Sequence, residues 1–78
     1  MNPVKKVRKS KNLSLKKTAE LLNSNYVTLT KVEKGQCLKT TYFTIIRKLS
    51  LAFDDIDDRK LIREYNNWLQ DNDLTIKE

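Results

Sequence analysis

The chain has 78 residues with 16 Lys or Arg and 10 Asp or Glu, which gives a formal net charge of +6 at pH 7. A chain of this length holds one domain with a small core, and because it has no histidine and only one cysteine, we expect neither an enzyme, nor a metal site, nor another cofactor. Its apolar runs are far shorter than the ~20 residues of a membrane span, and its start lacks the apolar segment of a signal peptide, so we expect a cytoplasmic protein without membrane contact.

The charges are divided unevenly along the chain. Residues 1–53 carry twelve Lys or Arg against two acids, a net of +10, whereas residues 54–78 carry four Lys or Arg against eight acids, a net of −4. A basic half is the electrostatic signature of a surface that binds a polyanion. We therefore expect one domain, in which residues 1–53 form a basic, polyanion-binding core and residues 54–78 add an acidic C-terminal helix and tail.

A single glycine and a single proline leave little room for hairpins, so the sequence favours an all-α fold. The first helix is expected to begin at Asn2 and Pro3, because Asn caps helices and proline is tolerated in the first turn. Val4 and Val7 give this helix one apolar edge, and its remaining residues are mostly lysine or arginine.

A second helix is predicted over residues 15–22. Its inward face is formed by residues at spacings of three and four, namely Leu15, Thr18, Ala19 and Leu22. Ser14 precedes this helix as a candidate N-cap. Lys16 and Lys17 lie in its first turn, where they are unfavourable for the helix dipole but suit a phosphate group at that end.

A third helix is predicted over residues 26–33, with Asn25 as its N-cap and Gly35 as its stop. The residues predicted to face inward are Leu29 and Val32. The turn between the second and third helices is so short that one residue needs a positive φ, which Asn23 tolerates best after glycine. Two short helices joined in this way predict a helix-turn-helix unit.

A fourth helix is predicted over residues 41–52, capped by Thr40 or Thr41. Its core stripe consists of Tyr42, Ile45, Ile46, Leu49 and Phe53. Phe43 lies off this stripe and is either a second core contact or an interface residue.

A fifth helix is predicted after residues 54–58, because four acids lie there and the helix dipole favours acids at a helix start. Its apolar stripe consists of Leu61, Ile62, Tyr65, Trp68 and Leu69. The stripe either caps the small core or pairs with a second copy across a two-fold axis. In the second case the dimer interface candidates are Leu61, Tyr65, Trp68 and Leu69. Residues 72–78 are predicted to be a frayed polar end.

The stretch from Leu13 to Gly35 resembles, without gaps, the helix-turn-helix of the phage repressor and Cro-type (XRE-like) family. The matching residues are Leu13, Ser14, Ala19, Leu22, Asn25, Leu29, Val32, Glu33, Lys34 and Gly35. Three positions depart from the pattern: Thr18 is usually leucine, Asn23 is usually glycine, and Ser24 is usually a small apolar residue. The asparagine is a conservative change of backbone preference, whereas Thr18 and Ser24 remove apolar area from the core.

The resemblance implies a compact five-helix, lambda-repressor-like domain whose residues 1–53 are a DNA-binding core and whose third helix reads the major groove. It also implies that either Leu49 or Leu51 occupies the usual leucine position of the fourth helix. The residues that it places at or beside base edges are Tyr26, Val27, Thr28, Thr30 and Lys31. The residues expected at the DNA backbone are Lys11, Lys16, Lys17, Asn25, Lys34, Lys39 and Thr40. A carboxylate repels phosphates, so Glu33 is expected to pair with Arg8 or Arg47 instead.

We therefore expect a sequence-specific double-stranded DNA-binding transcriptional regulator, acting as a repressor and as a homodimer on an inverted repeat. An alternative is an antirepressor that binds a partner regulatory protein, which is supported by apolar residues expected at the surface: Leu15, Leu21, Tyr26 and Val27. A third interpretation keeps the DNA contact but assigns it to replication, transfer or excision of a plasmid or other mobile element.

Overall fold

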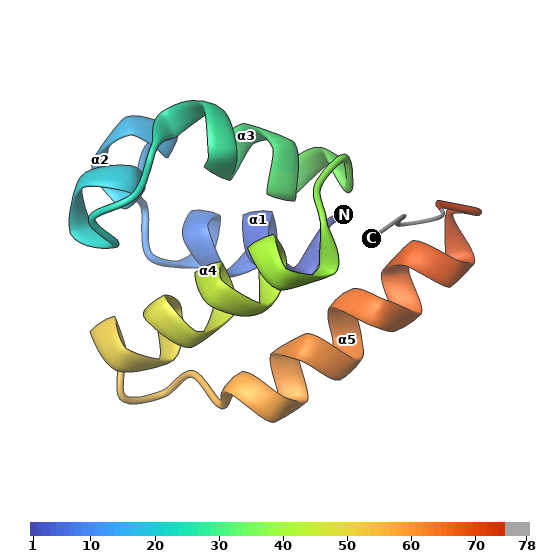
Figure 1. The fold of residues 1–78 in the computed structure, drawn as a ribbon. Coiled ribbons are helices and arrows are strands. Elements are labelled where there is room, and N and C mark those ends of the chain that lie inside the picture. The colour runs from blue at the N-terminus through green and yellow to red at the C-terminus, as the bar shows by residue number, and fades with distance from the viewer. Residues whose placement is uncertain (75–78) are drawn as a thin grey trace.

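A computed structural model describes residues 1–74 of the chain and contains five α-helices and no strand in that range. The helices are α1 (Pro3–Ser10), α2 (Leu15–Leu21), α3 (Tyr26–Lys34), α4 (Lys39–Ala52) and α5 (Asp58–Asp71). The predicted all-α fold is thus confirmed, and each predicted helix is present. Because α1 and α4 each pack against both α3 and α5, they lie between α3 and α5, which occupy the top and the bottom of Figure 1.

Side-chain caps fix the start of most helices. Asn2, Ser14 and Asn25 accept hydrogen bonds from backbone N–H groups in the first turns of α1, α2 and α3, at 2.8, 3.0 and 2.7 Å. Asp57 accepts two such bonds at the start of α5. The predicted N-caps Asn2, Ser14 and Asn25 are therefore confirmed. Each accepts a hydrogen bond from an N–H group that would otherwise have no partner at the start of a short helix.

The start of α4 differs from the prediction. Leu38 occupies the N-cap position and makes no side-chain cap, so the predicted capping by Thr40 or Thr41 is wrong. The N–H groups of Thr41 and Tyr42 already donate to the carbonyl oxygen of Leu38, at 3.0 and 3.2 Å, which places both threonines inside the helix. The first N–H groups of α4 consequently lack a side-chain acceptor.

The core lies around α4. The predicted stripe is buried at Tyr42, Ile45, Ile46 and Leu49 and half-buried at Phe53. It packs with buried residues of α1, α2 and α3, namely Val4, Ala19, Leu22, Leu29 and Val32. Leu49 is the core leucine, since Leu51 is 84% exposed. Phe43 is half-buried and makes an edge contact with Tyr42, at 5.2 Å between ring centroids, so it is a second core contact.

Helix α5 closes the core against α1 and α4. Tyr65 stacks on Tyr42 with ring centroids 4.2 Å apart, and Leu61 and Leu69 are buried beside it. Of the four dimer interface candidates, Leu61, Tyr65 and Leu69 are therefore covered within the chain, and Trp68 is half-buried. This packing supports the core-cap interpretation of α5 and leaves little of the stripe for a second copy.

The predicted polar end at residues 72–78 is only partly within the described range. Leu74 is half-buried and packs against the core, so the prediction of a frayed end is wrong at that residue, and residues 75–78 lie outside the described residues. No helix within residues 1–74 is long and apolar enough to cross a membrane.

Candidate nucleic-acid interface

The turn between α2 and α3 has the geometry that the sequence predicts. Asn23 adopts φ 49°, and the N–H of Ser24 donates to the carbonyl oxygen of Ala19 at 2.8 Å. Ala19 is buried where α2 meets α3. Thr18 is also buried, and its hydroxyl donates to the carbonyl oxygen of Ser14 at 2.8 Å, so the polar atom that replaces apolar area is satisfied.

Helix α3 has one fully buried face and one exposed face. Leu29 and Val32 have no exposed surface, whereas Tyr26 and Val27 are 52% and 54% exposed and Lys31 is exposed as well. Tyr26 and Val27 therefore do not pack into the chain's own interior. A short helix that exposes a tyrosine and a valine while burying its other side offers a binding surface.

The two predicted threonines lie at the flanks of that surface. Thr28 is half-buried and faces the start of α4, where it lines a shallow hollow. Thr30 is half-buried on the side of α1 and α2, and its hydroxyl donates to the carbonyl oxygen of Tyr26 at 2.9 Å.

A buried ion pair holds α3 against α1. Arg8 donates from Nε to Glu33 Oε2 at 2.7 Å and from Nη2 to Oε1 at 3.1 Å, while its Nη1 donates to the carbonyl oxygen of Leu13 at 2.8 Å. The prediction of a structural Glu33 paired with Arg8 is confirmed, and the alternative partner Arg47 is exposed on α4. One guanidinium thus ties together α1, α3 and the segment that leads into α2.

The end of α3 is held from two further places that the sequence analysis missed. Asn2 Nδ2 and the Tyr65 hydroxyl both donate to the carbonyl oxygen of Val32, at 3.0 and 2.7 Å. Gly35 then closes the helix with φ 72°, and Trp68 of α5 lies over it. These contacts join residues about 30 positions apart, so no local pattern indicates them.

Most of the residues predicted to contact the DNA backbone are exposed, at three helix starts and at one helix end. Lys16 and Lys17 are exposed in the first turn of α2, Lys34 is exposed at the end of α3, and Lys39 and Thr40 are exposed in the first turn of α4. Asn25 is exposed at the start of α3, where its side-chain oxygen serves as the cap.

Lys11 differs from the other lysines of this set because it has an ionic partner within residues 1–74. Its ammonium group donates to both carboxylate oxygens of Asp55, each at 2.7 Å, and lies 5.0 Å from the centroid of the Phe53 ring. The hydrogen bond from Lys11 lowers the pKa of the Asp55 carboxyl. Asp55 therefore competes with a phosphate for Lys11, and the contact of Lys11 with the DNA backbone stays a prediction.

A hydroxyl-rich hollow beside α3 adds residues that the sequence analysis did not select. It lies between the α2–α3 turn and α4 and is lined by Ser24, Thr28, Thr40, Thr41, Thr44, Ile45 and Lys48. Lys48 is half-buried there. Hydroxyls and one lysine can donate to anionic oxygen atoms, so this hollow extends the set of anion-binding groups beside α3 along α4. The signal in the sequence was the spacing of four between Thr40, Thr44 and Lys48.

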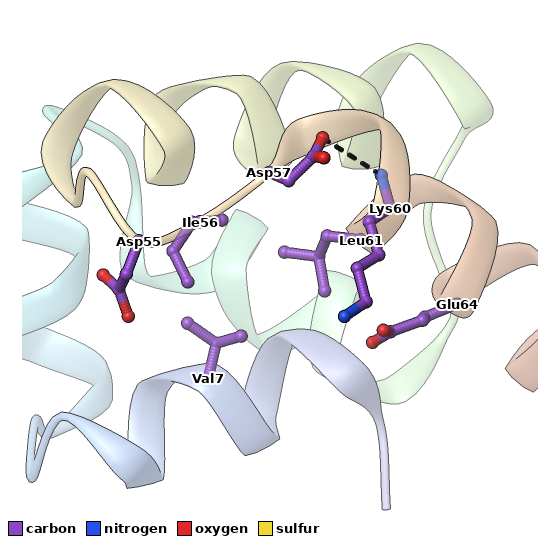
Figure 2. Close-up of a pocket in the computed structure, with 7 residues that line it drawn as sticks. All are labelled: Val7, Asp55, Ile56, Asp57, Lys60, Leu61 and Glu64. Atoms are coloured by element: carbon purple, nitrogen blue, oxygen red, sulfur yellow. Dashed lines mark hydrogen bonds between the residues drawn. The ribbon is translucent and has the colours of Figure 1, made fainter.

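A second hollow has the opposite character. Figure 2 shows it between α1 and the start of α5, with three carboxylates around apolar side chains. The residues that line it are Val7, Asp55, Ile56, Asp57, Lys60, Leu61 and Glu64. The start of α5 lies away from α3 (Figure 1), so this acidic hollow is separated from the exposed face of α3.

Comparisons of the chain with models of protein families, with curated proteins and with solved structures found no match. A function for this chain therefore has to be supported by its residues and their geometry.

Proposed function

We propose that the chain is a sequence-specific double-stranded DNA-binding transcriptional regulator of the repressor and Cro type. In this proposal the fold is lambda-repressor-like, α2 and α3 form its helix-turn-helix, and α3 enters the major groove. The observation that carries the proposal is the exposure of Tyr26, Val27 and Lys31 on a helix whose opposite face is anchored in the core. A rigidly held helix with an exposed face can place side chains at base edges reproducibly.

The exposed residues of α3 have suitable chemistry for reading bases. Lys31 can donate to guanine N7 and O6, and Val27 can contact a thymine methyl group. Thr28 can donate from its hydroxyl, whereas the Thr30 hydroxyl donates to the carbonyl oxygen of Tyr26 and can only accept from a base; both threonines can offer a methyl contact at the edges of the same surface. Tyr26, in the first turn, reaches a phosphate with its hydroxyl or stacks against a sugar.

The cations around α3 supply affinity that does not depend on sequence. Lys16, Lys17, Lys34 and Lys39 are exposed, and the uncapped start of α4 presents backbone N–H groups near Lys39. Each lysine that neutralises a phosphate contributes about −0.9 to the slope of log K against log salt concentration. We therefore assign these residues to the DNA backbone, with Asn25 and Thr40 as neutral donors beside them.

Two lysine variants test this division of roles. Lys31→Ala is expected to reduce the ratio of affinities for the preferred duplex and a scrambled duplex by about five- to 150-fold. Lys16→Ala is expected to weaken both duplexes alike and to make the salt slope less negative by about 0.9. Fluorescence anisotropy over a salt series measures both quantities.

The matched control is Lys60→Ala, which removes the same charge from the acidic hollow on α5. It is expected to leave both the affinity ratio and the salt slope unchanged. Equal effects of Lys31→Ala and Lys16→Ala on the scrambled duplex, or an effect of Lys60→Ala as large as theirs, would contradict the proposal.

The domain has one short reading helix, so two copies on an inverted repeat would supply a longer site, as the symmetry of such regulators requires. We accordingly propose a homodimer on DNA, with repression as the mode of action. The same contacts would also serve replication, transfer or excision of a mobile element.

A second candidate function is supported by one observation. Tyr26 and Val27 give the start of α3 an apolar surface that is unusual for a face meeting polar base edges. An antirepressor, which occupies the surface of a partner regulatory protein, would use such a patch. A gel shift at moderate salt separates the two functions, because the antirepressor would bind DNA only weakly and without sequence preference.

A further inference from the structure

Helix α3 lacks the side chains that read adenine. It carries neither asparagine nor glutamine, which bind adenine through two hydrogen bonds, and its exposed donor to guanine is Lys31. Asn25 lies just before the helix, but its side-chain oxygen already accepts from the N–H of Val27 at 2.7 Å. A contact with adenine through that oxygen would compete with the cap, so hydrogen bonds alone give α3 few ways to choose a site.

The start of α3 exposes carbon instead of polar groups. Tyr26 and Val27 are 52% and 54% exposed, although each could have been a polar residue at a solvent-facing position. Val27 and Lys31 are four residues apart, so they are neighbours on the surface of the helix. The exposed face of α3 therefore combines one cation with an apolar surface about one turn away.

The charges of α3 indicate what covers this apolar surface. Lys31 and Lys34 are exposed, whereas the side chain of Glu33, the one acid of the helix, is 6% exposed and paired with Arg8. A face whose exposed charges are cationic complements a polyanion. In the major groove of DNA, the apolar group on a base edge is the C5-methyl of thymine, and 5-methylcytosine carries the same group at the same ring position.

We propose that α3 selects duplexes by the C5-methyl group of a pyrimidine, thymine or 5-methylcytosine, which Val27 covers with Tyr26 beside it. One helical turn rises about 5.4 Å and one base step about 3.4 Å, so the methyl group lies within about two base pairs of the guanine that Lys31 reads. This role of Val27 rests on the proposed function. It places the exposed apolar pair against DNA instead of against a partner protein.

Replacing thymine with uracil tests this role, because uracil differs from thymine only in lacking the C5-methyl group. The probe is the motif that wild type enriches from a pool of random duplexes, made with uracil at one thymine position at a time. Wild type is expected to bind about fourfold more weakly for each contacted methyl group that is removed. Fluorescence anisotropy at one fixed salt concentration measures the thymine-to-uracil ratio of affinities.

Two variants show whether Val27 is the residue that senses the methyl group. Val27→Ala is expected to bring the thymine-to-uracil ratio below about twofold, because the contact is then lost in both duplexes. Lys16→Ala is the matched control, and it is expected to weaken both duplexes while keeping the ratio of wild type. Val27 and Lys16 are both exposed, and circular dichroism verifies that both variants are folded.

A second pair of duplexes identifies the source of the methyl group. The sensitive thymine–adenine pair is replaced with cytosine–guanine, in which the cytosine is either unmodified or methylated at C5. If a methyl group on either base is sufficient, methylation is expected to raise the affinity of wild type about fourfold and that of Val27→Ala less than about twofold. A gain with thymine alone assigns the contact to thymine.

The outcomes separate this role from the proposed function. A wild type that enriches a motif but binds its methylated and unmethylated forms equally overturns methyl recognition and leaves the DNA-binding function standing. A methyl effect that persists in Val27→Ala also overturns it, because the effect then comes from the shape of the DNA. A folded wild type that binds no duplex contradicts the DNA-binding function itself, and methyl recognition with it.

Discussion

Replacing Arg8 with alanine tests how α3 is held in place. The side chains of Arg8 and Glu33 are only 10% and 6% exposed, and they are joined by two hydrogen bonds. Arg8→Ala leaves the carboxylate of Glu33 in this covered site without its charged partner. It also removes the donor to the carbonyl oxygen of Leu13, which connects α1 to the start of α2.

The expected loss of stability is large for a domain of this size. Removing one partner of a buried ion pair costs about 3–5 kcal/mol, because the remaining charge is buried without compensation. A chain of 78 residues has a total free energy of unfolding of about 4–12 kcal/mol. Arg8→Ala should therefore remove at least a quarter of the stability, and at the low end of the range it should unfold the domain.

Urea unfolding at pH 7, followed by circular dichroism, measures this loss. Lys9→Ala is the control, since Lys9 is an exposed basic residue of the same helix, and it should change the free energy of unfolding by less than about 0.5 kcal/mol. The double variant Arg8→Met, Glu33→Leu should regain most of the loss, because no charge is then left buried. A loss below about 1 kcal/mol for Arg8→Ala would refute the reasoning, since the pair would then behave as a solvated one.

Three further predictions concern single residues. Gly35→Ala should destabilise the domain by about 2 kcal/mol or more in urea unfolding, because Gly35 has φ 72° and an added Cβ would lie 2.7 Å from Trp68 Cζ3; an unchanged midpoint would contradict this. Asn23→Gly should change the free energy of unfolding by no more than about 1 kcal/mol, because glycine tolerates the positive φ of 49° at this position. Asn23→Val should cost about 2 kcal/mol, because a β-branched residue does not. Thermal melts in which the two variants are equally stable would contradict this. NMR titration should show a lower pKa for the Asp55 carboxyl in wild type than in Lys11→Ala. The Lys11–Asp55 pair therefore stabilises the fold at pH values above the pKa of this carboxyl in the unfolded chain, and the stabilisation is lost as the pH falls through its lowered pKa in the folded chain. Equal pKa values in the two proteins would contradict the hydrogen bond.

Local patterns were sufficient for the helices and for most of their ends. The spacing of apolar residues indicated all five helices, and the caps at Asn2, Ser14 and Asn25 followed from side chains that accept hydrogen bonds from nearby N–H groups. The start of α4 was placed two residues late, because Thr40 and Thr41 have strong capping preferences and Leu38 has none. Tertiary packing of Tyr42 and its neighbours extends that helix regardless of the weak cap.

Contacts between distant residues could not be predicted in the same way. Lys11 looked like a free cation because Asp55, which neutralises it, is 44 positions away. The stripe on α5 had the correct spacing, but periodicity does not tell whether such a face meets the chain's own core or a second copy. The contacts of Asn2 and Tyr65 with the carbonyl oxygen of Val32 likewise depend on three separate helices.

The exposed face of α3 followed from the sequence because only one arrangement buries both Leu29 and Val32. With these two residues inward, Val27 and Lys31 must lie on the other side of the helix, and the structure has them exposed. The spacing of Thr44 and Lys48 places them on one face of α4, but it does not show that this face lies beside α3, because that depends on how α3 and α4 cross.

Selection of bound fragments from a pool of random duplexes tests the central claim most directly. The proposed contact of α3 with the major groove predicts that the wild-type chain enriches a short motif arranged as an inverted repeat. Lys31→Ala should lose the preference for guanine at the position that Lys31 reads, whereas Lys16→Ala should enrich the same motif as wild type. A pool that stays random after repeated rounds with folded wild-type protein, or a motif unchanged by substitutions at both Val27 and Lys31, would contradict the claim.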